Sequence, residues 1–230
     1  MLPPAVRWRA SLPVNFNLYL ITDRRQCAGD DLAACIEQAL RGGVGAVQLR
    51  EKDLPTRDRY ELALKLRSVT RASGALLLIN GDAALARAVG ADGLHLPQDG
   101  LPANVCRRIV DPHMLIGVST HTLNEAKDAE ARGADFITFG PVFQTPSKAQ
   151  YGSPVGLEAL QTACRTVTVP VFGLGGISAA RAETVATAGA AGIGVISAIL
   201  AAPDREGAAR EIARAWRKAL ARSDETMTKG

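Results

Sequence analysis

Eight apolar runs, each followed by a polar loop and in most cases by a helical pattern, succeed one another along this chain of 230 residues. The predicted strands are residues 17–23, 46–49, 75–79, 93–96, 115–118, 136–139, 169–172 and 192–196. Strands that alternate with helices through short loops must form a parallel sheet. Eight such units in a chain close to the roughly 250 residues of a closed barrel predict an α/β fold, a single-domain (β/α)8 TIM barrel.

An open, doubly wound sheet would also accommodate the alternation, but no G-x-G-x-x-G follows the first strand. The composition does not change between units, so we predict one domain with three parts. Residues 1–16 form an N-terminal arm, residues 17–222 the barrel and residues 223–230 a flexible polar tail. With 47% apolar but only 4% aromatic residues, the core should consist of Ala, Val, Leu and Ile, as is typical of helices packed on a parallel sheet.

Charge and hydropathy exclude several classes of partner. The net charge is only +4, and no basic run interleaved with aromatics is present, so no nucleic acid is expected. No apolar run approaches the ~18 residues of a membrane span, and prolines and arginines interrupt the first twelve residues, so we expect no membrane association and no signal peptide. The cysteines show no C-x-x-C spacing, which predicts reduced thiols in a cytoplasmic protein: Cys27, Cys35, Cys106 and Cys164.

The C-terminal ends of barrel strands open on one face, where ligands bind. The site candidates are therefore the polar residues and the glycine-rich turns at those ends: Gln48, Arg50, Lys52, Asn80, Asp82, Gln98, Asp99, Ser119, Thr145, Ser147, Lys148, Gly175, Gly176, Ile196 and Ser197. Three cations with several amides and hydroxyls are typical of a phosphorylated ligand with more than one phosphate. The turns after the seventh and eighth strands occupy the usual phosphate position of such barrels.

Several of these interpretations have a plainer alternative. Gly175 and Gly176 could form only a tight turn, and Arg50 and Lys52 could belong to a solvated charged loop. Gln48 either reads the edge of a heterocycle or is a hydrogen-bonded core residue.

The histidines show no spacing typical of metal ligands. His95 lies inside the fourth predicted strand, and we expect it to be a buried, hydrogen-bonded core residue. His121, just after the fifth strand, is the one histidine placed to carry a proton.

Ordered motifs extend over nearly the whole chain: LYLITD at 18–23, QLREK at 48–52, ADGLHL at 91–96, GVS at 117–119, FGPVF at 139–143 followed by Thr145 and Lys148, and VISAI at 195–199. Together they resemble the thiamine phosphate synthase family, which includes the TenI-type thiazole tautomerases. The resemblance implies a transferase of thiamine biosynthesis. Such an enzyme joins 4-amino-2-methyl-5-hydroxymethylpyrimidine diphosphate to thiazole phosphate and releases diphosphate. It also implies small phosphorylated substrates and magnesium as cofactor, and it allows a homodimer.

The resemblance further implies a mechanism and residue roles. The C–O bond to diphosphate breaks first, and the thiazole nitrogen attacks the resulting pyrimidine methyl cation, so neutralising the departing diphosphate matters more than a base. The implied catalytic residues are Arg50, Lys52, Lys148 and Ser119. The implied substrate contacts are Asn80 with the diphosphate, Gln48 and Ser119 with the pyrimidine, Thr145 and Ser147 with the thiazole, and Gly175, Gly176, Ile196 and Ser197 with the thiazole phosphate.

Two positions depart from the family's pattern. Gly81 and Gly100 stand where the synthases have aspartates that bind magnesium, and the remaining candidate metal ligands are their neighbours Asp82 and Asp99. This loss resembles the tautomerase branch, yet Pro141 stands where that branch has a histidine. Lys52 and Lys148 fit the synthase. Synthase chemistry is therefore the main expectation, with two alternatives: a thiazole tautomerase, or a non-catalytic binder of thiazole or thiamine phosphate.

Overall fold

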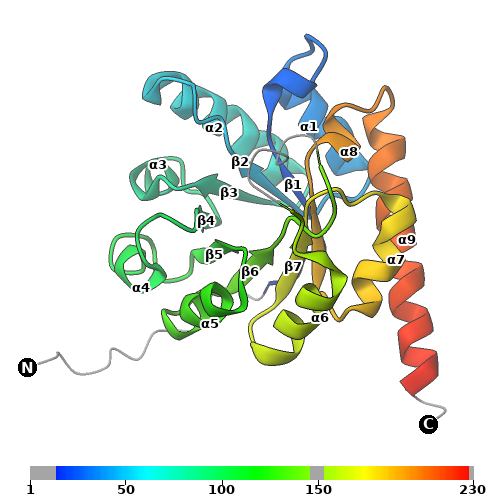
Figure 1. Ribbon diagram of the computed structural model, residues 1–230. Helices are drawn as coiled ribbons and strands as arrows, with labels where there is room; N and C mark the ends of the chain where they lie inside the picture. Colours follow the sequence, from blue (N-terminus) through cyan, green and yellow to red (C-terminus); the bar gives the residue numbers. More distant parts are fainter. Residues whose placement is uncertain (1–13, 146–152, 228–230) are drawn as a thin grey trace, which may run out of the picture.

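The computed structural model describes residues 14–145 and 153–227, and it contains a closed barrel of eight parallel strands in sequential order. The strands are β1 (Leu18–Ile21), β2 (Ala46–Leu49), β3 (Leu76–Asn80), β4 (Gly93–Leu96), β5 (Leu115–Thr120), β6 (Phe136–Phe139), β7 (Val171–Leu174) and β8 (Gly192–Val195). β8 pairs with β1 and closes the ring, with Leu20 opposite Val195. Helices surround the ring (Figure 1). The predicted (β/α)8 barrel is confirmed.

The helices follow the strands in turn. They are η1 (Arg24–Gln26, a 3-10 helix), α1 (Leu32–Arg41), α2 (Thr56–Ala72), α3 (Ala83–Ala88), α4 (Ala103–Cys106), α5 (Leu123–Ala131), α6 (Gly156–Thr166), α7 (Ala179–Thr187), α8 (Ser197–Leu200) and α9 (Arg205–Met227). Asp31, Asp82 and Thr122 cap α1, α3 and α5 by accepting a backbone hydrogen bond from the first turn. Ser178 precedes α7, and although serine is a favoured capping residue, its side chain makes no capping hydrogen bond. Among the described residues, no helix has the length and apolar character needed to cross a membrane.

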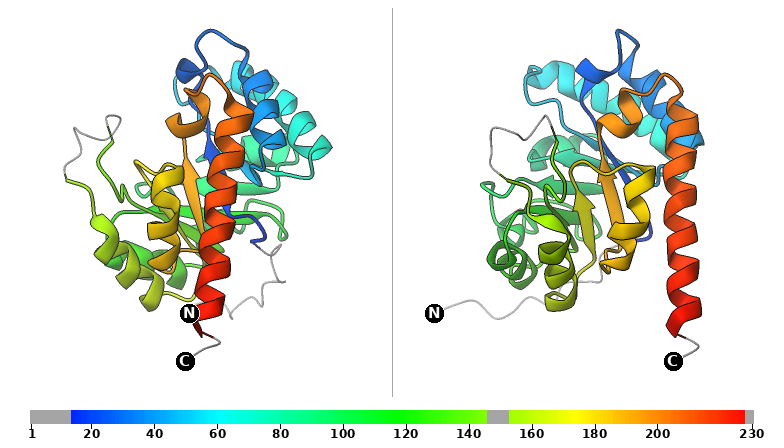
Figure 2. Two further views of the ribbon diagram at one scale, coloured as in Figure 1. Left: turned by 90° about the vertical axis from the view of Figure 1, so that its right-hand side faces the viewer. Right: turned by 45° about the vertical axis from the view of Figure 1, so that its right-hand side comes forward.

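Several elements differ from the sequence expectation. β5 extends two residues further, because Ser119 and Thr120 pair with Thr138 and Phe139 of β6. The unit after β4 has only a single helical turn, and the short α8 was not predicted. α9 continues to Met227 instead of ending near residue 222, and it runs along the outside of the barrel beside α7 (Figure 2).

The core has two layers of different composition. Between the strands and the helices it consists mainly of Ala, Val, Leu and Ile, as predicted. Inside the barrel, four aromatic residues form a cluster, in which Phe136 lies against Phe16, Tyr19 and Phe172 with ring centroids 5.4–5.9 Å apart. Phe16, which the sequence analysis assigned to the arm, is buried in this cluster. Gly117 makes room for the Phe136 ring, because a Cβ at position 117 would lie 2.3 Å from Cζ of Phe136.

Phe136 is the central ring of the interior cluster and is fully buried, so its removal should leave a cavity. We expect Phe136→Ala to lower the free energy of unfolding by about 3–5 kcal/mol, measured by chemical denaturation. Tyr60→Ala, on the exposed face of α2, is the matched control and should change it by less than about 1 kcal/mol. Equal losses in the two variants would show that the interior rings do not carry the fold.

Candidate active site

Five polar side chains from β1–β5 form a continuous hydrogen-bonded chain in the barrel interior. The Gln48 side-chain nitrogen donates to the Tyr19 hydroxyl at 2.8 Å, and the Asn80 side-chain nitrogen donates to Oε1 of Gln48 at 3.1 Å. The Tyr19 oxygen lies 3.2 Å from Nδ1 of His95, and Nε2 of His95 lies 3.0 Å from Oγ of Ser119. The structure thus joins three predicted site residues, Gln48, Asn80 and Ser119, through two that the site prediction did not include.

Burial fixes the protonation of this chain. It lowers the pKa of His95 to about 3, with a smaller contribution from the positive charge of Arg50, and it raises the pKa of Tyr19 despite the hydrogen bond from Gln48. Because neutral Tyr19 has no solvent to bond, its hydroxyl donates a hydrogen bond to the unprotonated Nδ1 of His95. Nε2–H of His95 then donates to Ser119, whose own hydroxyl proton is left for a ligand.

The buried members of the chain match the plainer interpretations. His95 is 1% exposed and hydrogen-bonded, which confirms the prediction of a core histidine. Gln48 is 2% exposed and satisfied by Tyr19 and Asn80, as expected of a hydrogen-bonded core residue. Asn80 directs both donors inward, to Gln48 and to the carbonyl of His95, so in this orientation its oxygen is what it offers to a ligand.

A cavity of about 360 Å³ opens at the ends of β3 and β4. Its lining residues are Lys52, Arg59, Asn80, Gly81, Asp82, Ala83, Leu96, Pro97, Gly100, Leu101 and Cys106. A small adjoining crevice is lined by Arg50 together with Lys52, Arg59 and Asn80. The structure therefore brings together Arg50, Lys52, Asn80 and Asp82. It adds Arg59, in the first turn of α2, which the sequence analysis did not single out.

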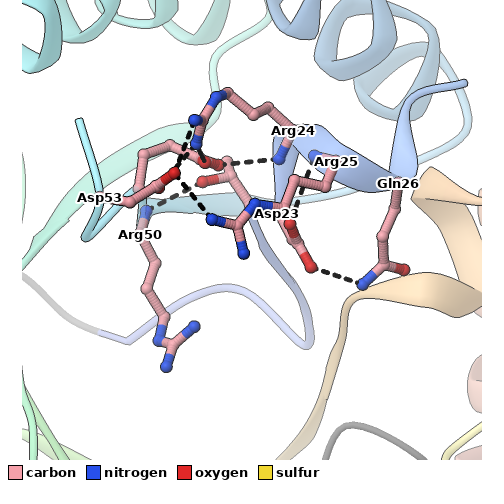
Figure 3. Close-up of polar contacts among 8 residues, drawn as sticks. Asp23, Arg24, Arg25, Gln26, Arg50 and Asp53 are labelled. Carbon is pink, nitrogen blue, oxygen red and sulfur yellow. Dashed lines mark hydrogen bonds and ion pairs between the residues drawn. The ribbon is translucent and has the colours of Figure 1, made fainter. Parts of the chain in front are cut away.

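Ion pairs hold the loop that carries Arg50 and Lys52. The Glu51 carboxylate, with its side chain 2% exposed, accepts hydrogen bonds from Arg24 at 2.8 Å and 3.0 Å. The 3.0 Å bond comes from the Arg24 backbone N–H and the 2.8 Å bond from its guanidinium. Asp53 accepts two more hydrogen bonds from that guanidinium at 2.7 Å, and this contact is the main cause of its lowered pKa. Figure 3 shows the Arg50 side chain pointing away from Arg24 and Asp53. The loop is thus anchored by its acidic residues, which leaves Arg50 available to a ligand.

The glycine turn after β7 is explained by a close approach of the chain. Gly175 and Gly176 have φ of +100° and +65°, and a Cβ on Gly175 would lie 2.6 Å from Cα of Pro141. Arg181 donates from Nη1 to the carbonyl of Gly176 at 2.6 Å and covers the Phe143 ring at 4.5 Å. A tight turn therefore accounts for these glycines on its own, and phosphate binding by them stays a prediction.

The other candidates occupy separate places on the rim. Ile196 and Ser197 begin α8 at the end of β8, where Ser197 is exposed. Thr145 is half-buried after β6, while Ser147 and Lys148 lie outside the described residues.

Gln98 is exposed, and His121 contacts the carbonyl oxygen of Gly140 through Nδ1. That contact ties the ends of β5 and β6 together at the rim and fixes the orientation of the imidazole.

The two carboxylates considered for magnesium do not meet. Asp82 lines the cavity, but its Oδ1 caps α3 by accepting from the N–H of Leu85 at 2.9 Å, and its Oδ2 lies 3.4 Å from Nη2 of Arg59. Asp99 is exposed and does not line the cavity. In the described part of the chain, no three His, Cys, Asp or Glu side chains are grouped as metal ligands. This donor set does not fit a magnesium ion held by paired carboxylates.

The depressed pKa of His95 predicts a pH dependence. The unfolded chain binds a proton near pH 6.5, whereas the folded chain binds it only near pH 3. The stability contributed by neutral His95 is therefore complete above about pH 6.5 and is lost as the pH falls toward 3. We expect its NMR ring signals to stay those of a neutral imidazole from pH 8 to about pH 4.5. A titration midpoint near 6.5 would contradict the buried chain.

Comparison with known proteins places this geometry in a family. The family described as "Thiamine monophosphate synthase" matches residues 18–199. A Geobacter sulfurreducens protein is 53% identical over 199 residues, covering 86% of this chain and 93% of that protein. A Moorella thermoacetica protein named thiamine-phosphate synthase is 42% identical, covering 86% and 94%. The solved thiamine phosphate pyrophosphorylase of Pyrococcus furiosus is 37% identical with a TM-score of 0.82, covering 89% of this chain and 97% of that one. The chain belongs to the thiamine monophosphate synthase family.

Proposed function

We propose that this chain is a transferase that joins 4-amino-2-methyl-5-hydroxymethylpyrimidine diphosphate to thiazole phosphate and releases diphosphate. Family membership over most of the chain supports the reaction class. The observation that carries the proposal is the group of cations at the barrel mouth, where Lys52 lines the cavity and Arg50 lines the adjoining crevice, with the amide of Asn80 between them in both linings. A leaving diphosphate bears several negative charges, and fixed cations at the end of a barrel are suited to hold it.

The proposed step requires electrostatic help more than proton transfer. The C–O bond between the pyrimidine methylene and the diphosphate breaks, and both bonding electrons leave with the oxygen. The thiazole nitrogen donates its lone pair to the methylene carbon and becomes a cationic thiazolium. No proton moves, so the step requires no general base. Arg50 and Lys52 would stabilise charge on the departing oxygen.

Ser119 is proposed to orient the pyrimidine. The chain from Tyr19 through His95 fills the acceptor side of its hydroxyl and leaves one O–H to donate to a ring nitrogen. Because His95 stays neutral, no competing positive charge is buried beneath the pyrimidine methyl cation. A neutral hydrogen-bonded chain beneath the pyrimidine suits such a cation, because a buried like charge would raise the energy of the cation.

The second substrate is proposed to lie toward β6–β8. The backbone N–H groups at Gly176 and Ser197, with Gly175 and Ile196 shaping the turns, would hold the thiazole phosphate at the usual phosphate position of the fold. Thr145 and Ser147 would contact the thiazole ring, and Lys148 would reach the diphosphate from the loop after β6. These roles agree with the positions of β7 and β8 next to each other in the ring.

Arg50 provides the sharpest test of the diphosphate contact. We expect Arg50→Ala to weaken binding of the pyrimidine diphosphate by ~1.5–3 kcal/mol, the range of a charge-assisted hydrogen bond, measured by calorimetry. Arg25→Ala removes a nearby cation whose side chain is 71% exposed and paired with Asp53, and it should change the affinity less than twofold. Unchanged affinity in Arg50→Ala would remove this residue from the site.

Turnover distinguishes the proposal from its two alternatives. Purified protein supplied with both substrates should form thiamine phosphate and diphosphate in equal amounts, followed by chromatography. Isomerisation of the thiazole carboxylate phosphate, without condensation, would favour the tautomerase alternative. Stabilisation by thiazole phosphate in a melting experiment, with neither reaction, would favour a non-catalytic binder.

A further inference from the structure

Arg59 is placed among the diphosphate candidates without belonging to the predicted set. It lies in the first turn of α2 and lines both the cavity and the adjoining crevice, in each case together with Lys52 and Asn80. Its side chain is 24% exposed, so the guanidinium is neither fully solvated nor sealed in the core. A helix that begins at the strand ends carries its first turn to the rim, which explains how Arg59 reaches the mouth.

The contacts of Arg59 position it without using all of its hydrogen-bonding capacity. Nη2 lies 3.4 Å from Oδ2 of Asp82 and 3.4 Å from Oγ1 of Thr56, both long contacts. Nε is buried and has no acceptor among the described residues. A buried donor without an acceptor costs roughly 1–3 kcal/mol, so a shift of the Arg59 side chain that brings Nε to a phosphate oxygen in the cavity would be favoured. Asp82 therefore orients the Arg59 guanidinium, and the remaining N–H donors of the guanidinium are left for an anion.

We propose that Arg59 supplies the positive charge that a carboxylate-bound metal ion would otherwise bring to the leaving diphosphate, so that the site binds diphosphate without a divalent cation. This inference rests on the proposed function. Among the described residues that line the cavity and the crevice, Arg50, Lys52 and Arg59 are cationic, while Asp82 and Glu51 are acidic. Glu51 is paired with Arg24. A guanidinium is always charged and can donate two parallel hydrogen bonds to phosphate oxygens.

The backbone also opposes carboxylates at the two positions facing this cavity. Gly81 has φ of +68°, a left-handed conformation that any side chain would strain. A Cβ on Gly100 would lie 3.1 Å from three atoms of Pro97, which is tighter than ordinary contact. Asp82 is already committed to α3 and to Arg59. Among the described residues that line the cavity, Arg59 supplies a fixed positive charge, and no pair of carboxylates is placed to hold a metal ion.

The binding experiment uses the full chain, inorganic pyrophosphate as the probe, and buffer containing EDTA. We expect wild-type protein to bind pyrophosphate under these conditions, and Arg59→Gln to weaken binding tenfold or more by calorimetry. Arg57→Gln changes an exposed arginine of the same helical turn that lines neither cavity nor crevice, and it should stay within twofold of wild type. Arg59→Lys, which keeps the charge but loses the planar fork, should fall between them.

Two results would overturn the inference: binding by wild type that requires magnesium, or Arg59→Gln binding as well as wild type while melting at the same temperature. Turnover of both substrates in EDTA separates this inference from the proposed function. Condensation that needs added magnesium contradicts the role of Arg59 and leaves the proposed reaction intact. Arg59-dependent pyrophosphate binding in EDTA, with no condensation in either buffer, supports the diphosphate site and counts against the reaction.

Discussion

The hydrogen bond between Tyr19 and His95 crosses the barrel interior between residues 76 positions apart in the sequence, and the mouth depends on it. Through it, β1 and β4 share a buried polar chain with Gln48, Asn80 and Ser119. Such a chain is stabilising when its buried members, here Tyr19, Gln48 and His95, are hydrogen-bonded. Barrel closure supplies that condition, because it fixes the register of all five strands at once. The orientation of Ser119 follows from the fold and not from its own loop.

A second set of contacts positions the charged side chains above this neutral polar chain. Arg24 and Arg25 pair with Glu51 and Asp53, so the two acidic side chains of the β2 loop are compensated, and Arg50 and Lys52 contribute positive charge to the mouth. Partly buried ion pairs of this kind contribute little net stability because desolvation offsets the attraction, but they fix position. The positive potential at the mouth is therefore pre-organised, as catalysis by charge stabilisation requires.

The sequence was sufficient for the barrel because eight strand–helix units leave few alternatives, and it placed Arg50, Lys52 and Asn80 on one rim because parallel strands share an edge. It did not reveal Arg24 or Arg59, since both lie in helical segments whose local pattern resembles any solvated face. Nor could it show that the Asp82 carboxylate caps α3 and contacts Arg59, or that Tyr19 is hydrogen-bonded to His95, because both depend on the three-dimensional arrangement of the strands and helices. The roles of Ser147 and Lys148 stay predictions from the family resemblance.

The central claim is that cations from separate segments surround one diphosphate at the C-terminal rim of the barrel. A crystal structure of the protein with pyrophosphate and thiazole phosphate bound tests it most directly. The account predicts diphosphate oxygens at hydrogen-bonding distance, about 2.7–3.1 Å, from the side chains of Arg50, Lys52 and Arg59. The thiazole phosphate should lie at Gly176 and Ser197. Diphosphate bound elsewhere, with these side chains directed to solvent, would contradict it.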